Sequence, residues 1–369
     1  MNPHLKPTLS NNLLLRTDSY KASHWLQYPP DAEHTFSYIE SRGGRYSHSL
    51  FFGLQAYLRE YLSTPVTHAD VAEAKAVYAA HGEPFNEAGW TRLVEKHGGL
   101  LPLRIRAVPE GMVLPVRNVL LTVENTDPEF FWLTSFIETE LLRGVWYPTT
   151  VATQSATAKS IIARYLHATS DCAEQELPFK LHDFGARGVS SLESAALGGM
   201  AHLVNFMGTD TVSALLAARR YYDCEMAGFS IPAAEHSTIT SWGREHEIDA
   251  YRNMLRQFAR PGSVVAVVSD SYDIFHACDA IWGQQLRDAV INSGATVVIR
   301  PDSGDPAMTV PQVVQILAQR FGYTTNSKGF KVLQYVRIIQ GDSINLTSLR
   351  HILHNLYKAG FSAENVAFG

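Results

Sequence analysis

The amino-acid sequence predicts an α/β fold, and the pattern of its second half is the main reason. Four short runs of β-branched or aromatic residues alternate with three helical patterns in which apolar residues recur at helical spacing. Strands that alternate with helices indicate parallel βαβ units. The expected strands are 264–268, 296–299, 336–339 and 366–368, and the expected helices are 274–291, 310–321 and 346–357.

Polar residues directly follow three of these four strands. Asp270 comes after the first, Asp302 after the second, and Gly341 with Asp342 after the third. In an α/β barrel, the residues at the carboxyl ends of the strands form the active site. We therefore expect these polar ends to lie together in space.

The first half of the chain has a mixed pattern that is typical of a small β-rich layer with helices. Strand-like alternation or β-branched runs and helical patterns follow one another there, with glycines near the expected helix ends. We therefore divide the chain into an N-terminal β-rich α+β region, 1–150, and a (β/α) region, 151–369. The expected strands are 35–40, 103–108 and 119–123, the expected helices are 67–80 and 86–96, and an apolar helix over 130–142 is expected to be buried between two layers or at a subunit contact.

Composition places the chain among globular proteins and excludes several partners. Its 369 residues are 46% hydrophobic and 18% charged, which is enough for one large core and a second small one. The formal net charge of -5 comes from interspersed charges, so we expect neither a nucleic-acid partner nor a membrane partner. The apolar run at 13–15 is too short for a signal peptide, and Glu138 and Glu140 interrupt the apolar segment at 130–147. Three widely spaced cysteines fit reduced thiols in a cytoplasmic protein; they are Cys172, Cys224 and Cys278.

Three polar constellations recur between residues 180 and 242. They are HDFGARG at 182–188, GTDT at 208–211 and PAAEHST at 232–238. Each follows a strand-like run or precedes a helix-like one, where the backbone changes direction and side chains can point into a common pocket. This distribution is typical of an active site.

The side chains in these constellations suit a particular chemistry. Phe184 and Arg187 supply an aromatic face and a guanidinium, a pairing suited to a flat ring that bears an acyl group and to a phosphate. Asp210 can accept a hydrogen bond from an amide NH2, and His236 can act as a base or a nucleophile.

Ordinary structural roles stay open for each of these side chains. Phe184 could be a core aromatic, since burial is the default use of phenylalanine. Arg187 could form an ion pair with a nearby carboxylate, and His236 could be a structural histidine. Asp210 could cap a helix over 211–220, because aspartate is favoured at that position.

These constellations resemble those of the nicotinamide phosphoribosyltransferase family. The resemblance also covers four further segments and spans nearly the whole chain. Seven motifs in one order are far more specific than any single short pattern. The four further segments are TDSYK at 17–21, VSDSYD at 268–273, IRPDSG at 299–304 and IQGD at 339–342.

The resemblance implies a fold and an activity. The expected fold is an irregular (β/α) barrel of the type II phosphoribosyltransferase kind, with an additional β-rich α+β layer. The expected reaction transfers phosphoribosyl from phosphoribosyl pyrophosphate to nicotinamide, giving nicotinamide mononucleotide and pyrophosphate in NAD salvage. The resemblance further implies Mg2+, ATP as a cosubstrate, and a homodimer with shared active sites.

The resemblance also assigns roles in binding the base. Phe184 stacks on one face of the pyridine ring, and Tyr20 of the opposite subunit stacks on the other. Arg187 contacts the substrate carbonyl and the phosphate side of the site. Asp210 accepts from the amide NH2, and its carboxylate would repel nicotinate.

His236 is expected to couple ATP to the reaction. In the family, the matching histidine is phosphorylated by ATP, and this drives an otherwise weakly favourable condensation. The position of His236 before a helical pattern at 237–244 fits, since a helix N-terminus favours added negative charge.

Ribose and metal chemistry is assigned to Asp302 and Asp342. Phosphoribosyl transfer passes through an oxocarbenium-like centre and expels pyrophosphate, so the protein needs acceptors for ribose hydroxyls, cations for phosphates and Mg2+ on the leaving group. Further residues match family positions or supply expected substrate contacts, and which residues hold the metal is left unassigned. They are Arg300, Gly341, Asp18, Lys21 and Arg42.

The sequence departs from the family at its end, Gly369. Family members continue with a glycine-rich turn that cradles the product phosphate, so we expect the barrel to be incomplete at the C-terminus, which leaves an unpaired edge. One alternative function is a nicotinate or quinolinate phosphoribosyltransferase, against which Asp210 argues because those substrates are acids. Another is an inactive fragment that binds a ligand or forms dimers without turnover.

Overall fold

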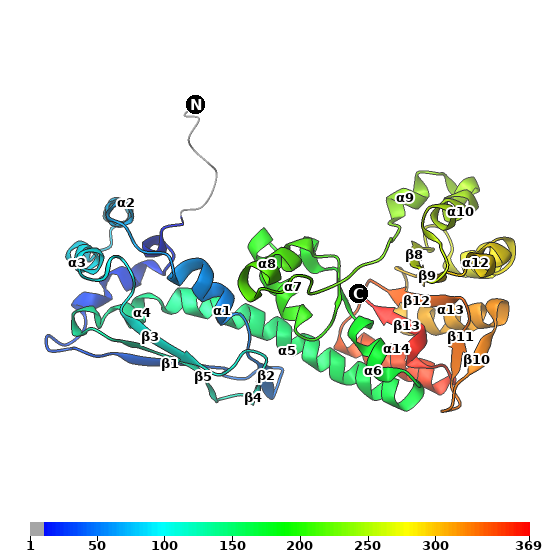
Figure 1. Cartoon of the computed structure of the whole chain (residues 1–369), viewed down its shortest axis with the longest axis horizontal. Helices are drawn as coiled ribbons and strands as arrows, with labels where there is room; N and C mark the ends of the chain where they lie inside the picture. The colour runs from blue at the N-terminus through cyan, green and yellow to red at the C-terminus, as the bar shows by residue number, and fades with distance from the viewer. Residues whose placement is uncertain (1–10) are drawn as a thin grey trace. The chain divides into compact units, whose positions relative to one another are not determined.

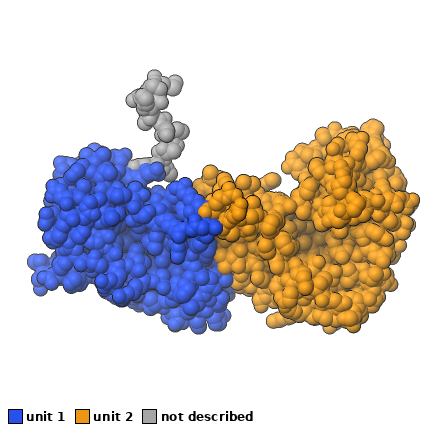
Figure 2. All heavy atoms as spheres, in the orientation of Figure 1, with its two compact units in different colours: residues 1–153, 220–223 blue, residues 154–219, 224–369 orange. Residues whose placement is uncertain are grey.

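The computed structural model describes residues 11–369, and the chain forms two compact units (Figures 1 and 2). Unit 1 comprises Met1–Thr153 and Arg220–Asp223, and unit 2 comprises Gln154–Arg219 and Cys224–Gly369. Among the described residues, no helix combines the length and the apolar character that crossing a membrane requires.

Unit 1 contains an antiparallel sheet with the strand order β1-β5-β3. Strand β5 is central, and it places Leu121 and Val123 in the core of the unit. The strands of the unit are β1 (Phe36–Glu40), β3 (Leu103–Ala107) and β5 (Val119–Asn125), together with the antiparallel pair β2 (His48–Leu50) and β4 (Val113–Pro115).

Two of its helices have the caps that the sequence indicates. Helix α2 (His68–His81) begins after Thr67, whose hydroxyl accepts from the Asp70 N–H, and it ends at a left-handed glycine, Gly82. Helix α3 (Glu87–His97) packs Trp90 against aromatic rings of the same core. The shorter helices are η1 (Leu13–Leu15), η2 (Ser19–Leu26), α1 (Leu54–Tyr57) and η3 (Leu58–Leu62).

The helix expected over 130–142 differs from the one observed. The segment forms η4 (Pro128–Phe130), α4 (Leu133–Phe136) and then α5 (Glu138–Thr169), a helix of 32 residues. Most apolar residues of the segment 130–142 lie in the core of unit 1, as their pattern indicates. The expected helix ended too early, and the observed α5 continues to Thr169 with Pro148, a residue that normally breaks a helix, inside it.

Unit 2 contains a parallel four-stranded sheet with the order β13-β12-β9-β8 (Figure 1). The four strands coincide with the expected ones to within a residue, because each is a buried run of β-branched or aromatic residues. They are β8 (Val264–Val268), β9 (Thr296–Arg300), β12 (Val336–Gln340) and β13 (Val366–Phe368).

Parallel pairing continues beyond both edges of this sheet. Strands β6 (His182–Asp183) and β7 (Gly208–Thr209) pair with each other, and Leu181, just before β6, forms a bridge to Phe368. The segment 229–234 forms one bridge to Gly208 of β7 and another to Ala266 of β8. The pairings thus pass from β8 through β13 and β6 to β7, and return to β8 through 229–234.

Helices connect these strands in unit 2. The expected helix at 274–291 is divided into three segments: α11 (Ile274–His276), η8 (Ala277–Gln285) and α12 (Arg287–Ser293). Helices α13 (Pro306–Phe321) and α14 (Leu346–Lys358) lie close to the expected ranges. The remaining elements are α6 (Ala173–Glu176), η5 (Leu177–Phe179), η6 (Gly185–Gly188), α7 (Leu192–Leu203), α8 (Val212–Tyr222), α9 (His236–Thr240), η7 (Arg244–His246), α10 (Glu247–Phe258), β10 (Tyr323–Thr325), β11 (Lys331–Leu333) and η9 (Ala363–Asn365).

Alternation along the parallel strands determines which residues share a face. Ala266, Val298 and Ile339 pack together, with Phe184 and Ile231 against them. We call the face that carries this cluster the inner face. Because side chains alternate along a strand, residues an even number of positions further on return to the inner face at the carboxyl ends. The positions concerned are Asp270, Arg300 and Gly341.

Candidate active site

The site is organised around Asp270, a carboxylate that directly follows the loop residue Ser269 at the end of β8. Its side chain is only 2% exposed, and its two oxygens have different partners. Oδ1 lies 2.9 Å from Nε2 of His236, and Oδ2 accepts the backbone N–H of Asp302 at 3.0 Å. One buried carboxylate therefore links the histidine at the start of α9 to the loop after β9.

Asp302 lies beside a cation and near other carboxylates. Its Oδ2 is 3.5 Å from a guanidinium nitrogen of Arg300. Burial raises the pKa of the Asp302 carboxyl, the positive charge of Arg300 opposes this shift, and the negative charges of Asp270 and Asp342 add to it. Asp342 is exposed, and its backbone carbonyl accepts from the amide of Gln340 at 3.0 Å. The polar ends of β8, β9 and β12 thus lie together, as the sequence predicted.

Phe184 is half-buried against two glycines at the ends of β12 and β13. A Cβ built on Gly369 would lie 2.1 Å from the ring carbon Cε2, and one built on Gly341 would lie 3.4 Å from it. The ring therefore rests directly on backbone at Gly369, where any side chain would displace it.

Asp210 follows β7 and is held at two points. Its backbone N–H donates to the carbonyl of Asp183 at 3.0 Å, which ties it to the end of β6. The hydroxyl of Ser230 donates to Oδ1 of the Asp210 carboxylate at 2.5 Å. The side chain is exposed, so its second oxygen is accessible.

Two histidines, the half-buried His182 and the buried His202, form hydrogen bonds to backbone carbonyls around β6. Nε2 of His182 lies 3.0 Å from the carbonyl of Phe179. The ring of His202 is bonded on both sides, through Nδ1 to the hydroxyl of Ser155 at 3.1 Å and through Nε2 to the carbonyl of Leu181 at 3.1 Å. Burial lowers the pKa of both histidines. The hydrogen bond from His202 to Leu181 ties the segment before Phe184 to α7.

His236 begins a helix that is shorter than expected. Helix α9 ends at Thr240, whereas the sequence pattern indicated residues 237–244. The turn is held by a capping box between Glu235 and Thr238. A single short helical turn has only a small dipole. The pairing with Asp270 is therefore the stronger determinant of the orientation of the His236 ring.

The expected contacts from the first motif lie in unit 1. The Tyr20 ring is 55% exposed, and Arg42 is also exposed. Asp18 accepts a hydrogen bond from the hydroxyl of Thr139 at 2.5 Å. Lys21 is buried and forms an ion pair with Glu138, so a phosphate contact by Lys21 requires that ion pair to open. Arg187, in unit 2, is exposed.

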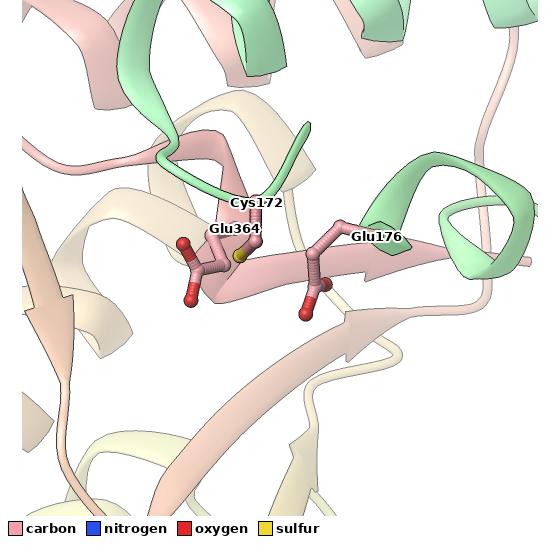
Figure 3. A group of neighbouring side chains, drawn as sticks. All are labelled: Cys172, Glu176 and Glu364. Carbon is pink, nitrogen blue, oxygen red and sulfur yellow. The ribbon is translucent and has the colours of Figure 1, made fainter. Parts of the chain in front are cut away.

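One cluster of side chains has the composition of a metal site. Ligand atoms of Cys172, Glu176 and Glu364 lie within 4.8 Å of one another (Figure 3). The carboxylates are already neutralised, because Nζ of Lys180 is 2.6 Å from Glu176 and a guanidinium nitrogen of Arg337 is 3.6 Å from Glu364. We interpret the cluster as a structural charge network. Its cysteine, like the other two cysteines, is free.

Two residues of the site were given no role from the sequence. Asp270 was placed among the polar strand ends that lie together, but its pairing with His236 was not predicted. Ser230 gave no signal, because it is 20 positions away from Asp210 and precedes the nearest recognised motif.

Comparison with known proteins gives two family matches. Residues 179–369 match the nicotinate phosphoribosyltransferase (NAPRTase) family, and residues 12–105 match the N-terminal domain of nicotinamide phosphoribosyltransferase. A nicotinamide phosphoribosyltransferase from Xanthomonas campestris is 65% identical over 359 residues, which are 97% of this chain and 76% of that protein. One from Acinetobacter baylyi is 33% identical over 97% of this chain and 78% of its own length.

Solved structures show the same fold at low identity. Human nicotinic acid phosphoribosyltransferase has a TM-score of 0.61 and 19% identity, covering 96% of this chain and 72% of that one. Nicotinate-nucleotide pyrophosphorylase from Pyrococcus furiosus has a TM-score of 0.60 and 13% identity, covering 100% of this chain and 74% of that one. A family model that matches more than half of the chain and a relative this similar along almost its whole length show that the chain belongs to the nicotinamide phosphoribosyltransferases of the nicotinate phosphoribosyltransferase family, pentosyltransferases of mixed α/β fold.

Proposed function

We propose that this chain transfers phosphoribosyl from phosphoribosyl pyrophosphate to nicotinamide in NAD salvage. The observation that carries the proposal is its 65% identity to a nicotinamide phosphoribosyltransferase over 97% of its residues. In the reaction, the bond between the ribose C1′ and pyrophosphate breaks, and the pyridine nitrogen forms a bond to C1′. The products are nicotinamide mononucleotide and pyrophosphate.

In this proposal the base lies against Phe184 and its amide points at Asp210. The Asp210 carboxylate is exposed beside β6, and Ser230 occupies only one of its oxygens, so the other is free to accept from an amide NH2. A nicotinate ring would bring a second negative charge to the same place. This favours nicotinamide over the nicotinate and quinolinate alternatives.

The ribose and the leaving pyrophosphate are proposed to bind at the ends of β8, β9 and β12. Three buried polar atoms there have no hydrogen-bond partner: Nε of Arg300, Oγ of Ser271 and Oε1 of Gln340. A ligand rich in oxygen would accept from the first two. The carboxylates of Asp302 and Asp342 are the kind of ligand that Mg2+ prefers. When bound, the metal neutralises charge on the leaving pyrophosphate. Arg187 from the Phe184 loop, and Asp18, Lys21 and Arg42 from unit 1, stay proposed substrate contacts.

ATP is proposed to phosphorylate His236. Nε2 of His236 pairs with Asp270, and the side chain is 46% exposed, so a nucleotide can reach it. The other nitrogen of the ring can attack the terminal phosphorus of ATP, the bond to the bridging oxygen breaks, and ADP leaves. Water then attacks the phosphorus, the N–P bond breaks, and the inorganic phosphate that leaves makes synthesis more favourable.

The finer architecture is also a proposal. We propose that the parallel pairings of unit 2 are those of an irregular (β/α) barrel, which the return of segment 229–234 from β7 to β8 supports. We further propose the division into an N-terminal region, 1–150, and a barrel region, 151–369, a cytoplasmic location, and a homodimer in which Tyr20 of one subunit faces Phe184 of the other. The exposed Tyr20 ring fits that role.

One assay tests the reaction. Purified protein is mixed with phosphoribosyl pyrophosphate and Mg2+, with and without ATP, and with nicotinamide, nicotinate or quinolinate in parallel. We expect mononucleotide from nicotinamide, and more of it with ATP. Product from nicotinate alone would replace the proposal with the acid-specific alternative, and binding of nicotinamide with no product would favour the ligand-binding alternative.

Three variants test the finer roles. His236→Ala should abolish an acid-labile phosphate label from labelled ATP while uncoupled synthesis persists, and retained ATP stimulation in this variant would contradict the role of His236. Tyr20→Ala and Phe184→Ala should each be inactive, yet a mixture of the two should recover activity if the site is shared between subunits. No recovery in a mixture that light scattering shows to be dimeric would rule out sharing.

A further inference from the structure

A buried chain of polar contacts lies behind the loop that carries Asp270. The indole N–H of Trp282 donates to the hydroxyl of Ser269 at 3.0 Å, and that hydroxyl donates to the carbonyl of Val267 at 3.0 Å. The ring of Tyr251 stacks on Trp282, with centroids 4.7 Å apart and an interplanar angle of 10°. Its hydroxyl donates to the carboxylate of Glu247 at 2.7 Å. The side chains that form these contacts are all buried.

Ser269 is fixed at both its backbone and its side chain. Its hydroxyl takes part in two hydrogen bonds, and its backbone N–H donates to the carbonyl of Arg300 at 3.0 Å. Ser269 shares the face of Val265 and Val267, opposite the inner face, where α10 and η8 supply Tyr251 and Trp282. The residue before Asp270 thus has no freedom to rotate.

The far end of the same loop is also anchored. Oδ1 of Asp273 accepts the backbone N–H groups of Phe275 and His276, at 2.9 and 3.0 Å, and so begins α11. The guanidinium of Arg244 lies 5.5 Å from the centre of the Tyr272 ring. The Asp270 carboxylate is therefore presented from a short loop that is held at both ends.

We propose that Ser269 and Trp282 are positioning residues for the pair formed by His236 and Asp270. The carboxylate uses both oxygens, one toward His236 and one toward the N–H of Asp302, so a rotation of the loop would break both contacts together. A tryptophan N–H buried in a core needs an acceptor, and here that acceptor is the residue adjacent to the functional carboxylate. The kinetic consequence rests on the proposed phosphorylation of His236.

Substitutions in the contacts between Trp282 and Ser269 can distinguish a positioning role from a purely structural one. Trp282→Phe keeps an aromatic ring against Tyr251 and removes only the donor. Ser269→Ala removes the acceptor. Ser362→Ala is a matched control, because Ser362 is also fully buried and its hydroxyl accepts one hydrogen bond, from the Glu364 N–H at 3.1 Å, near the amino end of β13.

The test combines kinetics with a direct probe of the histidine. We expect Trp282→Phe and Ser269→Ala to lower the rate of His236 labelling by ATP by about 10- to 100-fold, the range that a small misplacement of a reacting group produces. ATP stimulation of synthesis should fall with it, while KM for nicotinamide stays near that of the unaltered protein. Ser362→Ala should lower the thermal midpoint to a similar extent and leave labelling unchanged.

Imidazole 15N chemical shifts provide a second readout that does not depend on ATP. The His236 signals, identified by their loss in His236→Ala, should move in both variants toward those of Asp270→Asn. Unmoved signals with normal labelling in both folded variants would overturn the positioning role. Moved signals in a protein that ATP never labels would support it and would reject the proposed phosphorylation instead.

Discussion

Replacing Asp210 with asparagine tests how this site selects its base. The substitution keeps the shape of the side chain and removes one negative charge. Asparagine can accept from the nicotinamide amide, and it can also donate to a carboxylate. We therefore expect Asp210→Asn to relax selection toward nicotinate. The value of kcat/KM should change more for nicotinate than for nicotinamide.

The magnitude follows from the repulsion between two carboxylates. At a separation of ~4 Å, two unit charges interact by about 1 kcal/mol in water and about 4 kcal/mol at the effective dielectric of a protein surface. Asp210 is exposed, and its carboxylate accepts a hydrogen bond from the hydroxyl of Ser230. We therefore expect a value between these limits, which corresponds to roughly a 10- to 100-fold change in the ratio of kcat/KM for the two bases.

The assay is competition between nicotinamide and nicotinate at fixed phosphoribosyl pyrophosphate. Ser230→Ala serves as a companion variant, because it frees Oδ1 of the Asp210 carboxylate without removing the charge, and it should change the ratio much less. A preference in Asp210→Asn equal to that of the unaltered protein would show that the base is selected elsewhere. The carboxylate of Asp210 would then have no part in specificity.

Two further predictions concern the elements around Phe184. Gly369→Ala should raise KM for the base because the new Cβ would occupy the position of the Phe184 ring, and the effect should be small in a Phe184→Ala background; equal effects in both backgrounds would contradict this. Burial lowers the pKa of His182 and His202, so the stability that their neutral forms contribute is present above pH ~6.5 and is lost as the pH falls through that value toward their folded pKa values. Urea midpoints should therefore fall between pH 7.5 and pH 5, and His202→Gln should flatten that dependence; a slope unchanged by the variant would exclude His202 as a source.

The helices and strands could be predicted where residues close together in the sequence determine them. Thr67 before α2 and Gly82 after it are capping residues, and the structure uses both as caps. The four strands of the parallel sheet were readable because each is a short apolar run between polar residues. Their carboxyl ends were placed together correctly, since parallel strands of one sheet end at the same edge.

Non-local contacts were beyond the reach of sequence patterns. Strands β6 and β7 have two residues each, too few to show a period. The contact between His236 and Asp270 joins positions 34 apart, and the ion pair of Lys21 with Glu138 joins positions 117 apart. Nothing in the residues near Lys21 indicates a carboxylate partner so far away in the sequence, so the motif alone indicated only a phosphate contact.

The hydrogen bond between His236 and Asp270 also bears on which nitrogen can react. A carboxylate only accepts hydrogen bonds, so the ring proton must lie on Nε2, where Asp270 holds it. The lone pair is then on Nδ1, and that is the nitrogen that can attack phosphorus. Asp270 would keep its contact with Nε2 after the phosphoryl group arrives, and with it the contact to the Asp302 N–H. The same carboxylate can therefore orient His236, the proposed energy-coupling residue, and hold the loop of Asp302, the proposed ribose end of the site.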